Sequence, residues 1–200
     1  MEVLRLDSRI LSILLVLVAL AAALALWQYN VRDVSGAMNL STGGQSEYYI
    51  KFDGIDGECK DKDHKNWSDL LSFSQAISNK SDVATRRRGD AVFEPILLVK
   101  ELDKSSPKLA EAVAKGKVFP KVEIHVTNTY TDSGRVTYYA YELKNVWLAS
   151  YSISGTASVD EVPEEQVTLG FEEIKVTYTE ADEKGGSKGN IEYEWKVEEK

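Results

Sequence analysis

The chain has 200 residues, 43% of them hydrophobic and 28% charged, and a formal net charge of −8. This length fits one domain with an appendage, and the acidic balance argues against nucleic acid, which is bound by clustered lysine and arginine. Cys59 is the single cysteine, so no disulfide can form within the chain.

The first feature in chain order is an apolar segment from Ile10 to Trp27, in which Ser12 is the only polar residue. A helix of this length reaches roughly 27 Å, close to the ~30 Å hydrocarbon core of a bilayer. Arg5 and Arg9 precede it, which favours a cytoplasmic N-terminus and a domain outside the cytoplasm. We expect residues 1–27 to be a transmembrane signal anchor or a cleaved signal peptide.

The end of this segment carries a possible cleavage signal. Ala23-Leu24-Ala25 has small residues at the spacing that signal peptidases cut, so cleavage after Ala25 is the alternative to a retained anchor. A buried soluble helix is the weakest interpretation, because the segment has no polar face. Residues 28–46 are polar with glycine and serine, which predicts a flexible tether.

Three Asn-x-Ser sequences follow, at Asn39, Asn66 and Asn79. Outside the cell each could accept a glycan, although chance occurrence in a serine- and asparagine-bearing chain explains them equally well.

From Glu47 onward the apolar residues mostly alternate with polar ones, which predicts strands. The expected strands lie at 48–52, 71–77, 91–99, 122–126, 136–143, 146–153, 167–171, 174–178 and 191–197. Pro95 places the third of these at an edge or a bulge. The apolar face is formed by odd-numbered residues up to Phe171 and by even-numbered residues from Ile174 onward. One extra residue at Glu172-Glu173 would keep both sets on the same face, which predicts a β-bulge there.

One segment, 105–117, has a helical pattern. Ser106 is expected as N-cap, Pro107 at the first helical position and Gly116 just past the end. The residues alone therefore predict a mainly β domain at 47–200, an antiparallel β-barrel or closed sandwich with one short helix.

The acidic stretch 53–64 invites a calcium interpretation, but its residues do not fit an EF-hand loop. A solvated turn is the stronger interpretation, and an irregular cation site the weaker one. Cys59 and His64 lie five residues apart, yet a nucleophile and base need a third orienting group, and zinc needs more ligands. We expect no catalytic residue, no metal and no cofactor.

Five stretches resemble one known family in order and spacing. They are YIKFDGIDGECKDKDHKNW (49–67), LLSFSQAIS (70–78), KELDKSSPKLAEAVAKGKVFP (100–120), YELKNVWLASYSISG (141–155) and EEQVTLGFEEIKVTY (164–178). Residues 47–200 resemble Hcp, the tube protein of type VI secretion systems, and the third stretch is the most specific.

The resemblance implies an antiparallel β-barrel with a flanking helix, six subunits in a ring with a central pore, and rings that stack into a tube. Effectors or other secretion-machine proteins would be partners, and no enzymatic role is implied. The N-terminal segment departs from the family pattern. The expected function is thus a ring or tube subunit, exported or membrane-anchored with its domain outside the cytoplasm. The alternative is a monomeric surface-displayed binding module.

Arg86-Arg87-Arg88 is the only basic run, in the long connection between the second and third expected strands. In the family, loops here help rings contact one another. The run is therefore a candidate for contact with an acidic neighbour such as the 161–165 region of the next subunit, and a solvated loop is the plainer interpretation. Core and interface packing explain the aromatic residues of 138–151.

Overall fold

A computed structural model of the chain describes residues 47–80, 89–130, 132–157 and 162–197. The predicted membrane segment from Ile10 to Trp27, the cleavage position Ala25, the tether 28–46 and Asn39 lie outside these ranges. Arg86, Arg87 and Arg88 lie outside them too. Within these ranges, no helix has the length and apolar character needed to cross a membrane.

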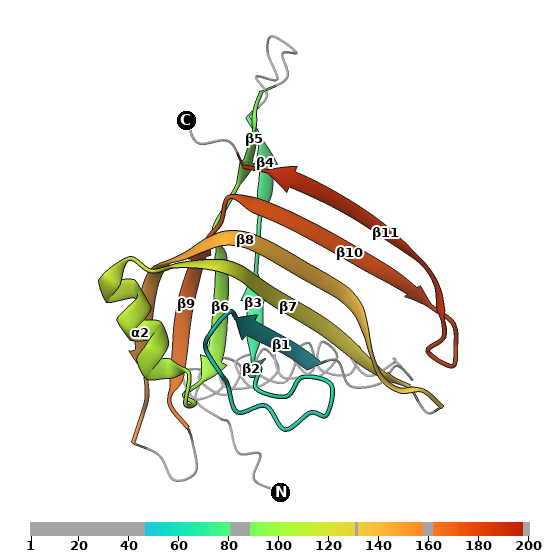
Figure 1. Ribbon diagram of the computed structural model, residues 1–200, viewed down its shortest axis with the longest axis horizontal. Helices are drawn as coiled ribbons and strands as arrows, with labels where there is room; N and C mark the ends of the chain where they lie inside the picture. The colour runs from blue at the N-terminus through green and yellow to red at the C-terminus, as the bar shows by residue number, and fades with distance from the viewer. Residues whose placement is uncertain (1–46, 81–88, 131, 158–161, 198–200) are drawn as a thin grey trace, which may run out of the picture. The chain divides into compact units, whose positions relative to one another are not determined.

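The described residues form eleven strands and one helix, which confirms the mainly β prediction (Figure 1). The elements are β1 (Glu47–Phe52), β2 (Ser68–Leu70), β3 (Ser72–Ser74), β4 (Ile77–Asn79), β5 (Ala91–Phe93), β6 (Ile96–Glu101), α2 (Ser106–Lys115), β7 (Val118–Tyr130), β8 (Gly134–Ser154), β9 (Glu164–Gly170), β10 (Glu173–Ala181) and β11 (Ser187–Lys196).

The main sheet is antiparallel and closes on itself. Its strands follow the order β2-β1-β7-β8-β9-β6-β3, with β10 and β11 continuing from β8. Only Leu71 separates β2 from β3, and its N–H donates to the carbonyl of Val99 at 2.9 Å. One short run, 68–74, therefore joins the two ends of the order.

Strand β8 is the longest element, with 21 residues, whereas the sequence pattern predicts two separate strands. Residues 139–144 of β8 pair with β10, and residues 147–154 pair with β9 along the same edge of the strand. The two parts meet at Asn145, whose φ of 50° is a left-handed conformation that asparagine tolerates. The polar Lys144-Asn145 link is thus a corner within one continuous strand.

The predicted bulge at Glu172-Glu173 is instead a break between two strands. Phe171 and Glu172 leave the ladder opposite the β8 corner, and β10 begins at Glu173. The change of inward parity is confirmed, because Phe171 and Ile174 are both buried. The register shift lies in the partner strand, between Leu148 and Ser150.

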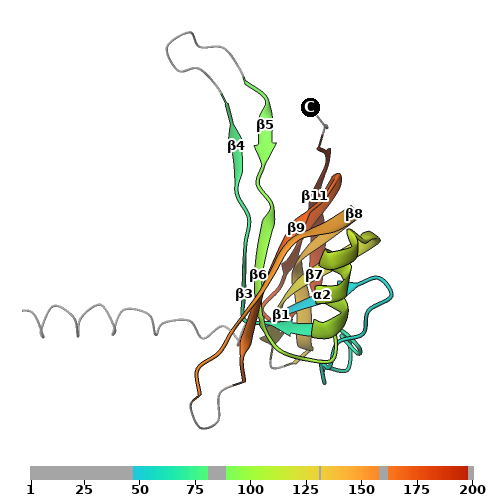
Figure 2. The ribbon, with the colours of Figure 1, turned by 90° about the vertical axis from the view of Figure 1, so that its left-hand side faces the viewer.

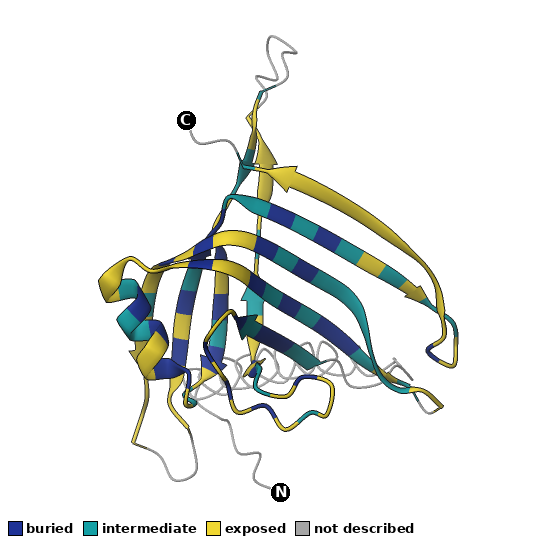
Figure 3. Cartoon of the chain, viewed as in Figure 1, coloured by how far each residue is buried: buried dark blue, intermediate teal, exposed yellow. Residues whose placement is uncertain are grey.

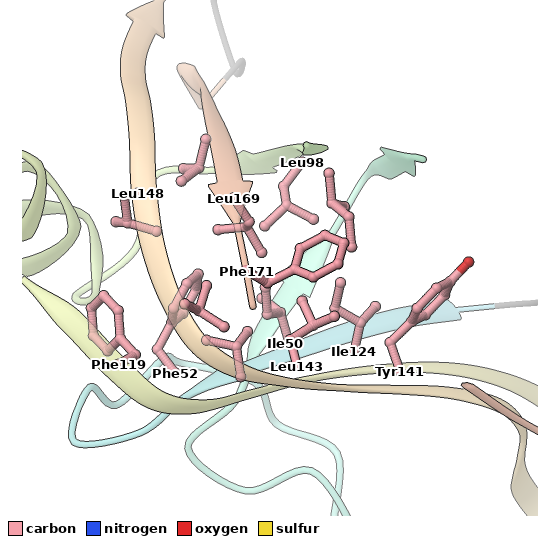
Figure 4. Close-up of a cluster of buried hydrophobic side chains, with 14 of the residues drawn as sticks. Ile50, Phe52, Leu98, Phe119, Ile124, Tyr141, Leu143, Leu148, Leu169 and Phe171 are labelled. Atoms are coloured by element: carbon pink, nitrogen blue, oxygen red, sulfur yellow. The ribbon is translucent and has the colours of Figure 1, made fainter. Parts of the chain in front are cut away.

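Alternating apolar residues of these strands form one core, as Figure 4 shows. Its members include Ile50, Phe52, Leu98, Phe119, Ile124, Leu143, Leu148, Leu169 and Phe171. Leu109 and Ala112 of α2 join this core, so the helix is held by its apolar stripe.

The helix begins one residue earlier than predicted. Ser105, not Ser106, is the N-cap, and no side-chain hydrogen bond caps the helix from it. The Ser105 hydroxyl donates instead to Asp103 at 2.5 Å, and the Ser106 hydroxyl accepts from the Asp103 N–H at 3.0 Å. The predicted end is confirmed: Gly116 has φ 61°, and the N–H groups of Gly116 and Lys117 close on Val113 and Ala112.

Two predicted strands are interrupted. The 91–99 run divides at Glu94-Pro95 into β5 and β6, which agrees with proline being excluded from a continuous ladder. The 71–77 run divides into β3 and β4, and Leu71 and Ile77 are exposed rather than inward. Strands β4 and β5 pair with each other and extend away from the main sheet (Figure 2).

Candidate assembly surface

Strands β10 and β11 form an amphipathic extension of the sheet, which we call the wing. Ile174 and Val176 sit opposite Leu143 and Tyr141 of β8 and continue the core face. The same face runs on through Tyr178, opposite Tyr139 of β8, to β11. Register places Ile191, Tyr193 and Trp195 of β11 opposite Tyr178, Val176 and Ile174 respectively.

This apolar face becomes exposed as it leaves the core. Ile174 is 1% exposed and Val176 3%, whereas Tyr178 is 42%, Trp195 50% and Ile191 73% exposed. Figure 3 shows β11 exposed along its length. Aligned large apolar side chains on one exposed face are typical of a protein contact surface. We call Tyr139, Tyr178, Ile191, Tyr193 and Trp195 the wing face.

The opposite side of the wing carries a lattice of charges. Lys175 pairs with Glu192 at 2.8 Å, and Lys144 of β8 pairs with Glu173 at 3.2 Å. Lys196 also approaches Glu173, at 3.9 Å. These alternating signs suit contact with water, so the two sides of the wing differ sharply in chemistry.

The outer edge of the wing is open in the described part of the chain. There, β11 pairs only with β10, so its outer backbone groups are available to another strand. The wing face is anchored at one end, because Trp195 stacks on Phe93 of β5 with ring centroids 5.9 Å apart.

The most specific stretch of the sequence, 100–120, begins with a buried ionic cluster. The Lys100 ammonium lies 2.6 Å from Glu165 and 3.0 Å from Asp103, and Lys100 and Glu165 are 1% and 0% exposed. Tyr151 donates to the other Glu165 oxygen at 2.6 Å, and Ser68 donates to Asp103 at 2.6 Å. Every charge has a partner, so this cluster ties β6, β9 and the start of α2 together.

These bonds also govern ionisation. Burial raises the pKa of Asp103, but hydrogen bonds from Ser105 and Ser68 and the nearby Lys100 charge outweigh it and lower the pKa overall. Glu165 is buried and therefore not free to meet Arg86-Arg87-Arg88 of a neighbour, which corrects part of the predicted acidic contact region. Glu164 remains exposed.

Most charged side chains of the acidic stretch are exposed, as in a solvated turn, but other residues of the same segment are buried. Residues 53–67, which we call the cover loop, lie over the outer side of β1 and β7. His64 is 3% exposed and stacks on Tyr49 of β1 with ring centroids 4.1 Å apart. Tyr49 is itself 1% exposed although it alternates with the core residues of its strand. The loop thus buries a second, outer layer of side chains.

The chain's two histidines meet beneath this loop. His64 Nε2 lies 3.0 Å from His125 Nδ1, and His64 Nδ1 lies 2.7 Å from Asp61 Oδ1. Arg135 of β8 donates to the other Asp61 oxygen at 2.6 Å and pairs with Glu47 at 2.7 Å. Sequence reasoning missed this contact because 61 residues separate the two histidines.

Cys59 shows no sign of activation as a nucleophile. It is buried, and burial raises the pKa of its thiol to about 12. Within the described ranges, no group of three or more histidine, cysteine or acidic side chains is placed to hold a metal ion.

Two sequons lie in the described part of the chain. Asn79 makes two bonds across the β4–β5 hairpin: its Nδ2 donates to the Gly89 carbonyl at 3.0 Å, and its Oδ1 accepts from the Gly89 N–H at 3.2 Å. Asn66 adopts φ 65°, and its carbonyl accepts from Lys51 Nζ at 3.0 Å. Glycosylation at either position stays a prediction.

Comparisons with known proteins agree on one family. The family described as "Type VI secretion system effector, Hcp" matches residues 49–178. Protein hcp1 of Pseudomonas aeruginosa is 28% identical over 155 residues, which cover 76% of this chain and 94% of that protein.

Solved structures show the same fold. One described as a type six secretion system protein superposes with a TM-score of 0.72 at 27% identity, covering 76% of this chain and 96% of its own. Hcp1 from Salmonella typhimurium has a TM-score of 0.59 at 25% identity, covering 74% and 93%.

Proposed function

Because this chain belongs to the Hcp family of type VI secretion tube proteins, which is structural and not enzymatic, we propose that it is a ring-forming subunit. Six copies form the ring, and stacked rings form a tube. The mechanism is self-assembly through complementary surfaces, with no covalent chemistry.

The observation that carries this proposal is the wing face. In a monomer, Ile191 is 73% exposed and Trp195 50% exposed on one aligned face, and this contact of apolar side chains with water does not stabilise the fold. A second copy covering this face buries apolar area, while the charged side of the wing stays in water. A closed ring also protects the open β11 edge, as closed assemblies do with sheet edges.

The test compares two lysine substitutions at adjacent positions of β11. Ile191→Lys puts a charge on the wing face, whereas Asn190→Lys puts the same charge on the other side of the strand, since adjacent strand residues face opposite ways. Both positions are exposed, so both variants should fold. We expect native mass spectrometry of the detergent-solubilised chain to show hexamers for the wild type and Asn190→Lys, and monomers for Ile191→Lys.

Two other outcomes are informative. Hexamers of Ile191→Lys would show that the ring uses another surface. A monomeric wild type at high concentration would instead favour the alternative function, a surface-displayed binding module that keeps the fold without assembling.

We propose further that the domain works outside the cytoplasm, brought there by residues 1–27. The support is the apolar run from Ile10 to Trp27, which is long enough for an anchor, with basic residues before it. Intact mass of the protein from membrane and medium fractions tests this. A full-length mass in membranes means an anchor, a mass beginning at Leu26 in the medium means a cleaved signal, and full-length protein in the cytoplasm contradicts export.

A further inference from the structure

Several hydrogen bonds join the cover loop to the sheet, among them Arg135 to Asp61 and Lys51 to Asn66. The bond between His64 and His125 differs from these, because it forms only when the two rings hold a particular number of protons. His64 belongs to the cover loop and His125 to β7, where it sits opposite Tyr49 of β1. The two facing nitrogens, His64 Nε2 and His125 Nδ1, lie 3.0 Å apart. At this distance one nitrogen must carry a proton and the other a lone pair.

The pair can therefore hold one proton between its facing nitrogens, but not two. If His64 is neutral with its proton on Nδ1, facing Asp61, then His125 donates to His64 Nε2. If His64 is the imidazolium, it donates to a neutral His125. When both rings are charged, two N–H groups point at each other between the buried His64 and the half-buried His125, and the contact must open.

The groups around the pair do not absorb this second proton. From the cover loop, Asp61 faces His64 Nδ1, and from β8 Arg135 holds Asp61 at 2.6 Å. From β1, Tyr49 stacks on His64, and its hydroxyl donates to Glu47. On β7 itself, Lys121 and Glu123 lie on the same side as His125 and pair with each other at 3.1 Å. Among the described residues, no carboxylate forms a hydrogen bond or ion pair with His125.

We propose that this hydrogen bond makes the cover loop an acid-sensitive cover on the outer side of β1 and β7, closed at neutral pH and released on acidification. The proposal is independent of ring formation. Opening exposes Tyr49, which the closed protein buries, and further exposes Trp67 and His125, which are half-buried in the closed state. Trp67 packs against both histidines, with ring centroids 5.0 Å from His64 and 4.4 Å from His125.

The electrostatics support the direction of this effect. Burial, followed by the charges of His64 and Lys121, lowers the pKa of His125 from 6.5 to about 4. When the loop is open, His125 regains its ordinary pKa. Between the two pKa values, His125 is therefore protonated in the open state and neutral in the closed state. Opening is then favoured about tenfold for each pH unit between about 6.5 and about 4.

Hydrogen exchange of the full-length chain in detergent micelles tests the proposal. After correction for intrinsic exchange, we expect peptides from 55–67 to lose protection about tenfold per pH unit below about pH 6.5, while peptides from β8 and β9 do not. His125→Asn places an amide near the position of Nδ1 without a titrating group, so its loop should keep a pH-independent protection. His125→Gln serves if the asparagine variant does not fold.

Two results would overturn the proposal. One is an unchanged pH dependence of the loop in the folded His125 variant, which would assign the effect to the carboxylates. The other is simultaneous loss of protection in the loop and in β8 and β9, which would mean that acid unfolds the whole domain rather than releasing the loop.

Discussion

Lys100 illustrates how a single residue can hold several elements. It is fully buried and touches Glu165 of β9 and Asp103 before α2. Its distance in sequence from Glu165, 65 residues, hides the pair from any local pattern. Sequence reasoning marked this stretch as specific through its family resemblance, but it could not say that the reason is a buried ion cluster.

Removing one partner of this cluster should be costly. Lys100→Met leaves Glu165 buried and unpaired, so we expect the free energy of unfolding to fall by about 3–5 kcal/mol in urea titrations. Lys108→Met on the exposed side of α2 is the matched control and should change stability little, because the Lys108–Glu111 pair is exposed. Equal effects of the two substitutions would contradict the cluster's role.

Cys59 gives a second prediction at this scale. Since burial raises the pKa of its thiol to about 12, the thiolate is scarce near neutral pH. We expect labelling by a thiol reagent to be slow in the folded protein and fast in urea. Rapid labelling of the folded protein would mean that the cover loop is open at neutral pH.

At the scale of elements, α2 was the best-predicted part of the fold. Pro107 and Gly116 are local markers, and the left-handed φ of 61° at Gly116 accompanies the closing bonds to Val113 and Ala112. The start was misplaced by one residue because Ser105 and Ser106 both bond to Asp103. Asp103 is held in turn by Ser68, which lies 35 residues away in sequence, as well as by the nearby Lys100.

The Gly116 cap can be tested with a pair of substitutions. Asparagine tolerates the left-handed conformation, whereas a β-branched residue does not. We expect Gly116→Asn to cost less than about 1 kcal/mol and Gly116→Val clearly more, measured by thermal unfolding. A Cβ at this position meets no neighbouring atom within 4 Å, so crowding does not confuse the comparison.

At the scale of the whole molecule, stability should depend on pH in a defined direction. The pKa of Asp61 is lowered despite its burial, by hydrogen bonds from His64 and the Asp63 N–H and by Arg135. Such carboxylates stabilise the fold above about pH 4, and this contribution is lost as they are protonated. His125, with its pKa lowered to about 4 by burial and nearby charges, adds a loss that begins at about pH 6.5.

Urea unfolding midpoints measured at several pH values test the combined contributions of the carboxylates and of His125 to stability. We expect the wild-type midpoint to fall from about pH 6.5 downward, and the His125→Asn midpoint to stay level until carboxylates titrate at about pH 4 to 5. A wild-type curve that is flat down to about pH 5 would show that His125 is not perturbed by the fold.

Local patterns in the chain were enough to predict the strand-rich domain, the helix between Ser106 and Gly116, to within one residue at its start, and the family. Period-two alternation, helix-end residues and motif spacing are all properties of neighbouring residues. They also located Ile191, Tyr193 and Trp195 on one strand face. The folded chain was needed to show that this face lies beyond the core, that 68–74 closes the sheet, and that His64 meets His125. Exposure and pairing depend on which distant segments cover a residue, and alternation is the same whether a strand face is covered or open.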